Sequence, residues 1–499
     1  MRKGIDILFI SPGNSRVIYQ DLANEYTAIE PPIWAGLLAQ FCRKKNYDTS
    51  IIDQEAQGLT SDQIAINAAE LNPKITAIIV YGQQPSASTQ NMTMAEEIAG
   101  KLKQFAPDTS SIMIGVHPSA LPERTLEESE TDFVCQGEGP YTLEGLVETT
   151  NLKDDTLLKK IPDLWFLQDG KCVFTFSGSV VPGKELPEVL PGMAWDLLPM
   201  DTYRAHNWHC FGHINDRKPY ASLYTSLGCP YKCSFCCINT PFGKPSIRYW
   251  DPGFVINELD ILANKYGVKN IKIADEMFVL QEDHVMRLCD QIIERGYDFN
   301  FWAYARVDTV KDKFLEKLKK AGFNWLALGV ESKSKHVRDG SQKGNYSDQD
   351  IKDIVKKIQD AGIYVLANYI FGLPDDTHES MQETLDLAVE LNCEGANFYS
   401  GMAYPGSKLY NISIEKGWAL PKRWHDFSQH SYGQQPLPTE HLRAEEVLRF
   451  RDHAWQHYFT NPKYLSMLGE KFGQSAVDHI SEVSSITLKR KLLEESPTP

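Results

Sequence analysis

The 499-residue chain has no apolar run that approaches the roughly 20 residues of a membrane-spanning helix. It has no low-complexity tract, and its only repetition is an alternation of strand-like and helix-like segments. Basic residues are outnumbered, 51 Lys and Arg against 66 Asp and Glu, and the formal net charge of −15 disfavours a general nucleic-acid surface. Its 42% of hydrophobic residues suffices for two or three domain cores. We therefore expect a soluble, cytoplasmic, multidomain protein that has no membrane span and binds no nucleic acid.

The ten cysteines follow no regular disulfide framework, which favours a reducing compartment. Three of them, Cys229, Cys233 and Cys236, form a C-x3-C-x2-C triplet on one short segment. Three thiolates on a turning loop can hold an iron–sulfur cluster and leave one iron open to a small molecule. A zinc site, which needs a fourth Cys or His at compact spacing, and plain buried thiols remain as alternatives. Cys237 adjoins the triplet, but we expect its side chain to point elsewhere.

This loop resembles the signature loop of the radical S-adenosylmethionine superfamily, including the aromatic Phe235 before the last cysteine. The resemblance implies that the three cysteines bind a [4Fe–4S] cluster whose open iron chelates S-adenosylmethionine. It also implies that an electron from the cluster, supplied by a donor such as flavodoxin or ferredoxin, cleaves S-adenosylmethionine to a 5'-deoxyadenosyl radical.

Around the triplet, β-branched or aromatic segments alternate with amphipathic ones, a pattern of parallel strands joined by helices. Six strands would curl into a partial (β/α)6 barrel, with the cysteine loop after the first strand, at the end where βα loops build active sites. The same partial barrel is implied by the resemblance. The predicted strands are residues 220–227, 270–274, 300–305, 325–331, 364–371 and 395–400, and the predicted helices are residues 252–266, 281–295, 311–321, 347–361 and 377–391.

The ends of the barrel strands carry four charged candidates for cofactor binding. Asp275 and Glu276 follow the second strand, where the resembled family contacts the methionyl amine, although they could instead cap the next helix. Arg306 ends the third strand and could hold a carboxylate of the cofactor or substrate, or could simply be solvated. Glu331 lies in Gly-Val-Glu-Ser, which resembles a family element that contacts the ribose hydroxyls of S-adenosylmethionine.

The first 150 residues read as a doubly wound, Rossmann-like open sheet, whose ligands bind at the carboxyl ends of its strands. Strands are predicted at residues 5–10, 49–53, 76–81, 111–115 and 132–136, with helices at 33–45, 61–71, 91–105 and 141–148. Small polar residues in the loops after these strands would let backbone amides approach a ligand. The candidates are Ser11, Gly13, Gln84, Ser86, Ser88, Thr89, Gly115, His117, Gly137, Glu138 and Gly139.

These loops resemble the amino-terminal cobalamin-binding domain that is fused to many radical S-adenosylmethionine proteins, which implies cobalamin as a third cofactor. The Asp-x-His-x-x-Gly motif of other cobalamin proteins is absent after the first strand. Fused radical enzymes often lack this motif, although a degenerate domain without cobalamin remains an alternative. For His117 we favour loop geometry or a corrin amide contact over ligation of cobalt.

The domain boundaries follow from these patterns. We expect a cobalamin-binding domain at 1–150, an ordered linker with a small hairpin at 151–217, the barrel at 218–425 and a helical carboxyl-terminal region at 426–499.

The two implied cofactors together predict a cobalamin-dependent radical methyltransferase that acts on an sp3 carbon or phosphorus of a small-molecule or peptide substrate. A radical enzyme that oxidises, cyclises or rearranges without methylating is one alternative, and a non-catalytic corrinoid- or metal-binding module is another. Methylthiolation would need three further clustered cysteines, whereas the other amino-terminal cysteines are scattered. The side chains expected to line the barrel are Tyr304, Asn368, Tyr369, Tyr399 and Met402.

Overall fold

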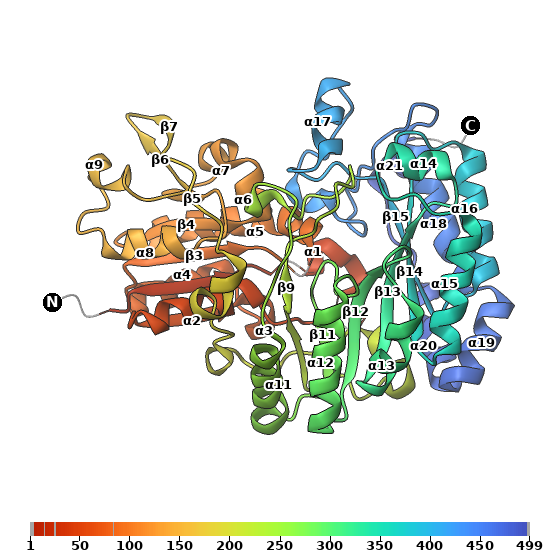
Figure 1. The fold of residues 1–499 in the computed structure, drawn as a ribbon. Helices are drawn as coiled ribbons and strands as arrows, with labels where there is room; N and C mark the ends of the chain where they lie inside the picture. The colour runs from red at the N-terminus through yellow and green to blue at the C-terminus, as the bar shows by residue number, and fades with distance from the viewer. Residues whose placement is uncertain (1–3, 14, 24–25, 83, 497–499) are drawn as a thin grey trace.

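The computed structural model describes residues 4–496 except 14, 24, 25 and 83 (Figure 1). The amino-terminal half forms a seven-stranded sheet of order β2-β1-β3-β4-β5-β6-β7, in which β1 to β5 are parallel. The hairpin expected in the linker is present, and it extends this sheet by antiparallel pairing of β6 with β5. The strands are β1 (Ile7–Ser11), β2 (Thr49–Asp53), β3 (Ile75–Val80), β4 (Ser110–Gly115), β5 (Phe133–Cys135), β6 (Leu164–Gln168) and β7 (Lys171–Phe174).

Helices cover both faces of this sheet, as its strands require. Side chains alternate along β1, so that Ile7 and Phe9 pack in one apolar core while Leu8 and Ile10 pack in another. The first core includes α2 and α8, and the second includes α4 and α5. These helices are α2 (Ile33–Lys44), α4 (Ser61–Leu71), α5 (Pro85–Phe105) and α8 (Pro140–Glu148).

Two predicted loops of this half are helical. Helix α5 begins at Pro85, six residues before the predicted start, because proline is well suited to the first helical turn, and Ser86, Ser88 and Thr89 therefore lie on a helix. The segment after β4 forms the short helix α6 (Val116–Ala120), which contains His117.

The carboxyl-terminal half holds six parallel strands in the order β15-β14-β13-β12-β11-β8, so that β8 and β15 lie at the two edges of a partial barrel. The predicted first strand is too long, because β8 ends at Leu223 and residues Ser226–Leu227 form β9, which pairs antiparallel with β10 (Arg248–Tyr249). The barrel strands are β8 (Tyr220–Leu223), β11 (Asn270–Ile273), β12 (Asn300–Arg306), β13 (Phe323–Glu331), β14 (Tyr364–Phe371) and β15 (Gly395–Ser400).

Amphipathic helices follow the strands and cover the outside of the barrel, where α11, α12 and α13 stand side by side (Figure 1). Their apolar residues pack on the strands in the same core as the first face of the amino-terminal sheet. The helices are α11 (Pro252–Tyr266), α12 (Glu282–Arg295), α13 (Asp312–Lys320), α15 (Asp348–Asp360) and α16 (His378–Leu391).

The chain ends in a helical region that packs on the barrel edge. Tyr458 on α18 (Ala444–Phe459) donates a hydrogen bond to the Cys393 carbonyl at 2.7 Å, and Arg451 donates to the Phe398 carbonyl at 2.8 Å. Helices α19 (Pro462–Phe472), α20 (Gln474–Ser485) and α21 (Lys491–Glu495) follow. Within the described residues, every helix is too short or too polar to traverse a lipid bilayer.

Candidate active site

One cavity of about 660 Å³ lies between the amino-terminal sheet and the barrel. Loops after the strands of the first sheet, the cysteine loop and inward-facing barrel side chains all contribute to its wall. Eleven of the nineteen predicted site residues line it, so segments more than 300 positions apart in the chain share one space. They are Ser11, Gly13, Gln84, Ser86, Cys229, Cys233, Phe235, Cys236, Glu276, Arg306 and Glu331.

A glycine turn and the Asn239 side chain hold the cysteine loop in place. Gly228 has a φ of +87°, and a side chain there would meet the Ser246 carbonyl oxygen at 2.5 Å, so the turn into the loop requires glycine. The Asn239 side chain accepts from the Cys229 amide at 3.2 Å and donates to the Cys229 carbonyl at 2.9 Å. Cys237 is buried and lies outside the cavity wall, in agreement with the expectation that its side chain points elsewhere than those of the triplet.

The spacing of the three thiols argues against a single metal ion. Zinc binds thiolates at about 2.3 Å, so two thiolates on one zinc ion lie roughly 4 Å apart. Among the described residues, only Glu123, Glu127 and Cys172 bring three such ligand atoms within 4.8 Å of one another. At least one pair of the Cys229, Cys233 and Cys236 sulfur atoms is therefore more than 4.8 Å apart, which is wider than a zinc site requires, while a cluster with an iron for each thiolate tolerates the wider spacing.

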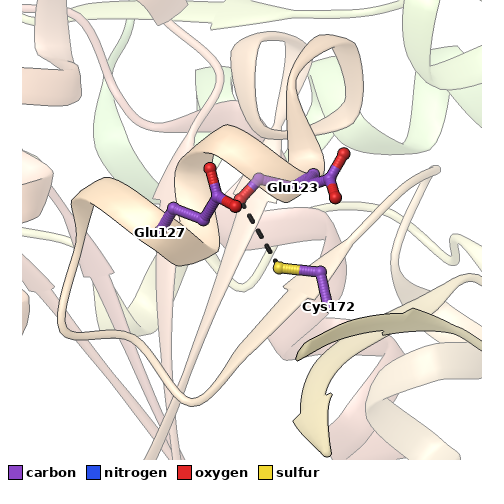
Figure 2. Close-up of side chains that lie close together, drawn as sticks. All are labelled: Glu123, Glu127 and Cys172. Carbon is purple, nitrogen blue, oxygen red and sulfur yellow. Dashed lines mark hydrogen bonds between the residues drawn. The ribbon is translucent and has the colours of Figure 1, made fainter. Parts of the chain in front are cut away.

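Figure 2 shows the group formed by Glu123, Glu127 and Cys172. None of these three residues lines the cavity. Both carboxylates are exposed on α7 (Pro122–Glu128), and Cys172 is on the neighbouring strand β7. Exposed carboxylates on one helix face are common without an ion, so this group is not assigned a metal.

Burial favours the protonated form of Cys229 and Cys236. It raises the pKa of Cys229 to about 11 and the pKa of Cys236 well above its ordinary value. All ten cysteines are free thiols. Because metal binds thiolates, loading of this loop must release protons.

The side chains of the adjacent residues Asp275 and Glu276 lie in different surroundings. Asp275 is fully buried outside the cavity wall and accepts from the Thr225 amide at 2.6 Å, the Thr225 hydroxyl at 2.6 Å and the Ser226 hydroxyl at 2.7 Å. It thus ties the end of β11 to the segment that leads into the cysteine loop. Glu276 lines the cavity, and burial raises its pKa from 4.5 to about 8, with the adjacent Asp275 carboxylate adding to the shift.

We expect Glu276 to make the stability of the cofactor-free protein fall between pH 4.5 and 8. In this window the folded carboxyl group keeps its proton while the unfolded group loses it, so unfolding releases a proton and the free energy of unfolding drops as pH rises. Glu276→Gln should gain stability relative to wild type from pH 5 to pH 8, measured by urea unfolding. An equal effect of the exposed Glu415→Gln, or no pH-dependent difference for Glu276→Gln, would contradict this assignment.

Arg306 reaches the cysteine loop from the end of β12. Its Nη1 donates to the Cys233 sulfur at 3.5 Å, and its guanidinium lies 3.7 Å from the Tyr231 ring centroid. Asp308 accepts from Nε and Nη2, each at 2.9 Å, and only 4% of the Arg306 side chain is exposed. The arginine is therefore fixed against the loop and is not solvated.

Glu331 is held on the cavity wall in a strained backbone conformation. Its φ of +66° is in the left-handed region, at the irregularity where β13 leaves register with β14. Lys343 pairs with its carboxylate at 2.5 Å, and both side chains are 8% exposed. The place of Lys343 in the cavity wall could not be predicted from the sequence, because this residue lies in a loop with no periodic pattern.

Ser11, Gly13, Gln84 and Ser86 lie in the part of the wall that comes from the loops of the first sheet. The Gly13 amide donates to the Gln54 side chain at 2.9 Å, and a side chain at Gly13 would meet the Glu55 Cβ at 2.7 Å. This glycine lets the loop lie flat against α3 (Gln54–Gln57) beside the cavity.

His117, Ser88 and Thr89 form a buried cluster outside the cavity wall. The Ser88 hydroxyl accepts from the His117 amide at 2.9 Å, and the His117 Nδ1 lies 3.2 Å from the Thr89 hydroxyl. Burial lowers the pKa of His117 to about 3, and its ring packs edge-on against Trp424 at 4.4 Å. His117 thus packs as a neutral ring in the loop, and its contact with a corrin amide stays a prediction.

The remaining candidates also lie outside the cavity wall. A side chain at Gly115 would meet the Val80 carbonyl oxygen at 2.0 Å, and Gly139 has a φ of +103°, so both positions need glycine for the fold. Gly137 donates its amide to the Ser119 hydroxyl at 3.1 Å. Glu138 makes two hydrogen bonds with Arg248, at 2.7 and 3.1 Å, across the interface of the two halves.

Part of the cavity wall is polar and includes Glu30 and Lys272, which could not be predicted from the sequence. Lys272 on β11 pairs with Glu30 at 3.1 Å, although 242 positions separate them, and the Tyr220 hydroxyl donates to the same carboxylate at 3.0 Å. Of the expected barrel-lining set, Tyr369 does not line the cavity, because along β14 it alternates with Asn368 and Ile370, which do. The other four line the cavity, namely Tyr304, Asn368, Tyr399 and Met402.

Both halves of the chain match known protein families. Residues 223–388 match the family model of the Radical SAM superfamily, and residues 19–147 match that of the B12 binding domain. The uncharacterized methyltransferase PH0819 of Pyrococcus horikoshii is 30% identical over 436 residues, which cover 87% of this chain and 89% of that protein. The anaerobic magnesium-protoporphyrin IX monomethyl ester cyclase of Rubrivivax gelatinosus is 25% identical and covers 92% of this chain and 78% of its own.

Among solved structures, the radical S-adenosylmethionine methyltransferase TsrM from Kitasatospora setae, with cobalamin and a [4Fe–4S] cluster bound, superposes with a TM-score of 0.69. The match covers 97% of this chain and 99% of that chain at 15% identity. The predicted fold class, a Rossmann-like amino-terminal sheet followed by a partial (β/α)6 barrel and a helical region, is confirmed.

Proposed function

Because this chain belongs to the radical S-adenosylmethionine superfamily, in the group that carries a B12-binding domain, we propose that it methylates an unactivated carbon or phosphorus of a small-molecule or peptide substrate. The three cofactors predicted from the sequence, a [4Fe–4S] cluster, S-adenosylmethionine and cobalamin, follow from this membership. We also keep the predicted division of the chain, at 1–150, 151–217, 218–425 and 426–499, as part of the proposal.

The observation that carries the proposal is the single shared cavity. The cysteine loop, the strand-end loops of the first sheet and the barrel interior all face it. A reaction between two cofactors and a substrate needs their reacting atoms close together and shielded from water. Two separate pockets on the two halves would not meet this need.

The residues in the wall fit the groups that they would hold. Three thiols on one loop, with at least one pair of sulfur atoms farther apart than a zinc site requires, suit an iron–sulfur cluster. Glu276 and Glu331 offer carboxyl groups for the amine and ribose hydroxyls of S-adenosylmethionine. For cobalamin we propose contacts with Ser11, Gly13, Gln84 and Ser86, and a supporting role for Ser88, Thr89, Gly115, His117, Gly137, Glu138 and Gly139.

When bound, the cofactors supply radical generation and a transferable methyl group. The protein's own residues bind and orient these cofactors. Neither radical generation nor methyl transfer needs a general base among the residues of the cavity wall. The polar side chains of Lys272, Glu30, Tyr304 and Asn368 in the cavity wall would bind the substrate by hydrogen bonds. Tyr399 and Met402 also line the cavity and would help to exclude water.

A non-methylating radical reaction is the second candidate. The magnesium-protoporphyrin cyclase of Rubrivivax gelatinosus, which is named for ring formation, resembles this chain over 92% of its length. The same cavity would serve both reactions, so product analysis must separate them.

The proposal includes an electron donor of the flavodoxin or ferredoxin class and a reducing, cytoplasmic location. A cluster of this type must receive one electron for each cleavage, and its cysteines must escape disulfide formation. All ten cysteines are free thiols, which supports the proposed location.

The test uses full-length protein reconstituted without oxygen with iron, sulfide and cobalamin. With S-adenosylmethionine, a strong one-electron reductant and a candidate substrate, we expect both 5'-deoxyadenosine and S-adenosylhomocysteine by liquid chromatography with mass detection. Formation of 5'-deoxyadenosine alone, with an unmethylated product, would favour the second candidate. Intact S-adenosylmethionine after reduction of the reconstituted protein would refute both.

A further inference from the structure

The guanidinium of Arg306 is divided between two partners. Its Nε and Nη2 bind Asp308, each at 2.9 Å, and Nη2 also donates to the Lys343 carbonyl. Its Nη1, on the other side, points at the Cys233 sulfur at 3.5 Å. The two nitrogens that could bind a carboxylate of the cofactor or substrate, Nε and Nη2, are thus already bound to Asp308. The remaining nitrogen, Nη1, faces Cys233, a proposed cluster ligand.

This contact is rigid and shielded from solvent. The Tyr231 ring stacks on the guanidinium at 3.7 Å and belongs to the same loop as Cys233. Only 4% of the Arg306 side chain is exposed, so water screens its charge weakly. Its partner Asp308 is 31% exposed and lies on the far edge, so the positive charge is both nearer to the sulfur and less screened than the negative one.

We propose that Arg306, through its hydrogen bond to the Cys233 sulfur, raises the reduction potential of the cluster and so eases its one-electron reduction. The inference rests on the proposed function, because it assumes that Cys229, Cys233 and Cys236 bind a [4Fe–4S] cluster. Arg306 acts here as a tuning residue and does not touch the substrate.

The direction of the effect follows from charge. In the step concerned, the [4Fe–4S]²⁺ cluster gains one electron from an external donor of the flavodoxin or ferredoxin class and becomes [4Fe–4S]⁺, while the donor loses one electron. The reduced cluster is one unit more negative, so a fixed cation and a hydrogen bond to a ligand sulfur stabilise it more than the oxidised cluster. Asp308 opposes this stabilisation from farther away.

The experiment measures the midpoint potential of the reconstituted full-length protein, without S-adenosylmethionine, by a redox titration that follows the electron paramagnetic resonance signal of the reduced cluster. Arg306→Met should shift the potential to a more negative value. Asp308→Asn, which keeps the arginine and removes the opposing charge, should shift it to a more positive value. Lys232→Met is the matched control, because Lys232 also carries one positive charge and adjoins Cys233, but is exposed.

We expect the Lys232→Met potential to equal that of wild type within error. An unchanged or more positive potential in Arg306→Met overturns the inference, as does a Lys232→Met shift of equal size. If Arg306→Met loses the cluster, the Asp308→Asn titration decides, and an unchanged or more negative value overturns the inference. A wild-type protein that assembles no cluster refutes the proposed function itself, whereas a cluster with an insensitive potential refutes only the role of Arg306.

Discussion

A Cys236→Ala variant is expected to lose the iron–sulfur cluster and all measurable cleavage of S-adenosylmethionine. Changes in groups that merely support a metal ligand cost about 10–100-fold in affinity or activity, so removal of a ligand should cost at least roughly 100-fold. Cys236 is one of three thiols in the cavity wall, and no neighbouring thiol in that wall can replace it, since Cys229 and Cys233 are themselves ligands in the proposal. The measurements are iron and sulfide content, the visible absorption of the cluster, and 5'-deoxyadenosine yield.

The adjacent Cys237 gives a matched control for this prediction. It is 1% exposed and lies outside the cavity wall, so Cys237→Ala removes a buried sulfur without removing a cluster ligand. We expect this variant to keep its cluster and its activity and to lose about 1 kcal/mol of stability. Loss of the cluster in Cys237→Ala together with its retention in Cys236→Ala would contradict the assignment of ligands.

How much of this site could be predicted from the sequence depends on the range of the signal. The cysteine triplet and Phe235 lie within eight positions, and the other predicted residues of the cavity wall lie at or soon after the ends of strands, so local pattern and parallel topology sufficed to bring them together. Asp275 and Glu276 show the limit of this reasoning. Both follow the same strand, but one faces the turn below the cysteine loop and the other faces the cavity.

Contacts between distant segments could not be predicted, because no local pattern records them. Glu30 and Lys272 are 242 positions apart, and only the packing of the two halves brings their charges together. His117 was placed correctly after the fourth strand, but the Trp424 ring that packs against it lies 307 positions further along the chain, at the end of the segment assigned to the barrel. Trp424 therefore packs in the second core of the amino-terminal sheet.

The second large effect concerns Glu138, which sequence analysis assigned to cofactor binding. Its carboxylate pairs with Arg248 through two hydrogen bonds and also accepts from the Val181 amide at 2.6 Å. The exposed fractions of the Glu138 and Arg248 side chains are 4% and 9%. Removal of one partner of a buried pair leaves the other charge uncompensated, at a cost of about 3–5 kcal/mol.

We therefore expect Glu138→Gln to lower the thermal unfolding midpoint of the cofactor-free protein by about 3–5 °C, because the unfolding entropy of a 499-residue chain is large. The matched control is Glu128→Gln, which breaks the exposed Glu128–Arg124 pair and should cost less than about 1 kcal/mol. A double variant, Glu138→Leu with Arg248→Met, should recover much of the loss, because it leaves no unpaired charge. If Glu138 served cobalamin alone, Glu138→Gln would weaken cobalamin binding and leave the unfolding midpoint of the cofactor-free protein unchanged, which is the reverse of what the ion pair requires.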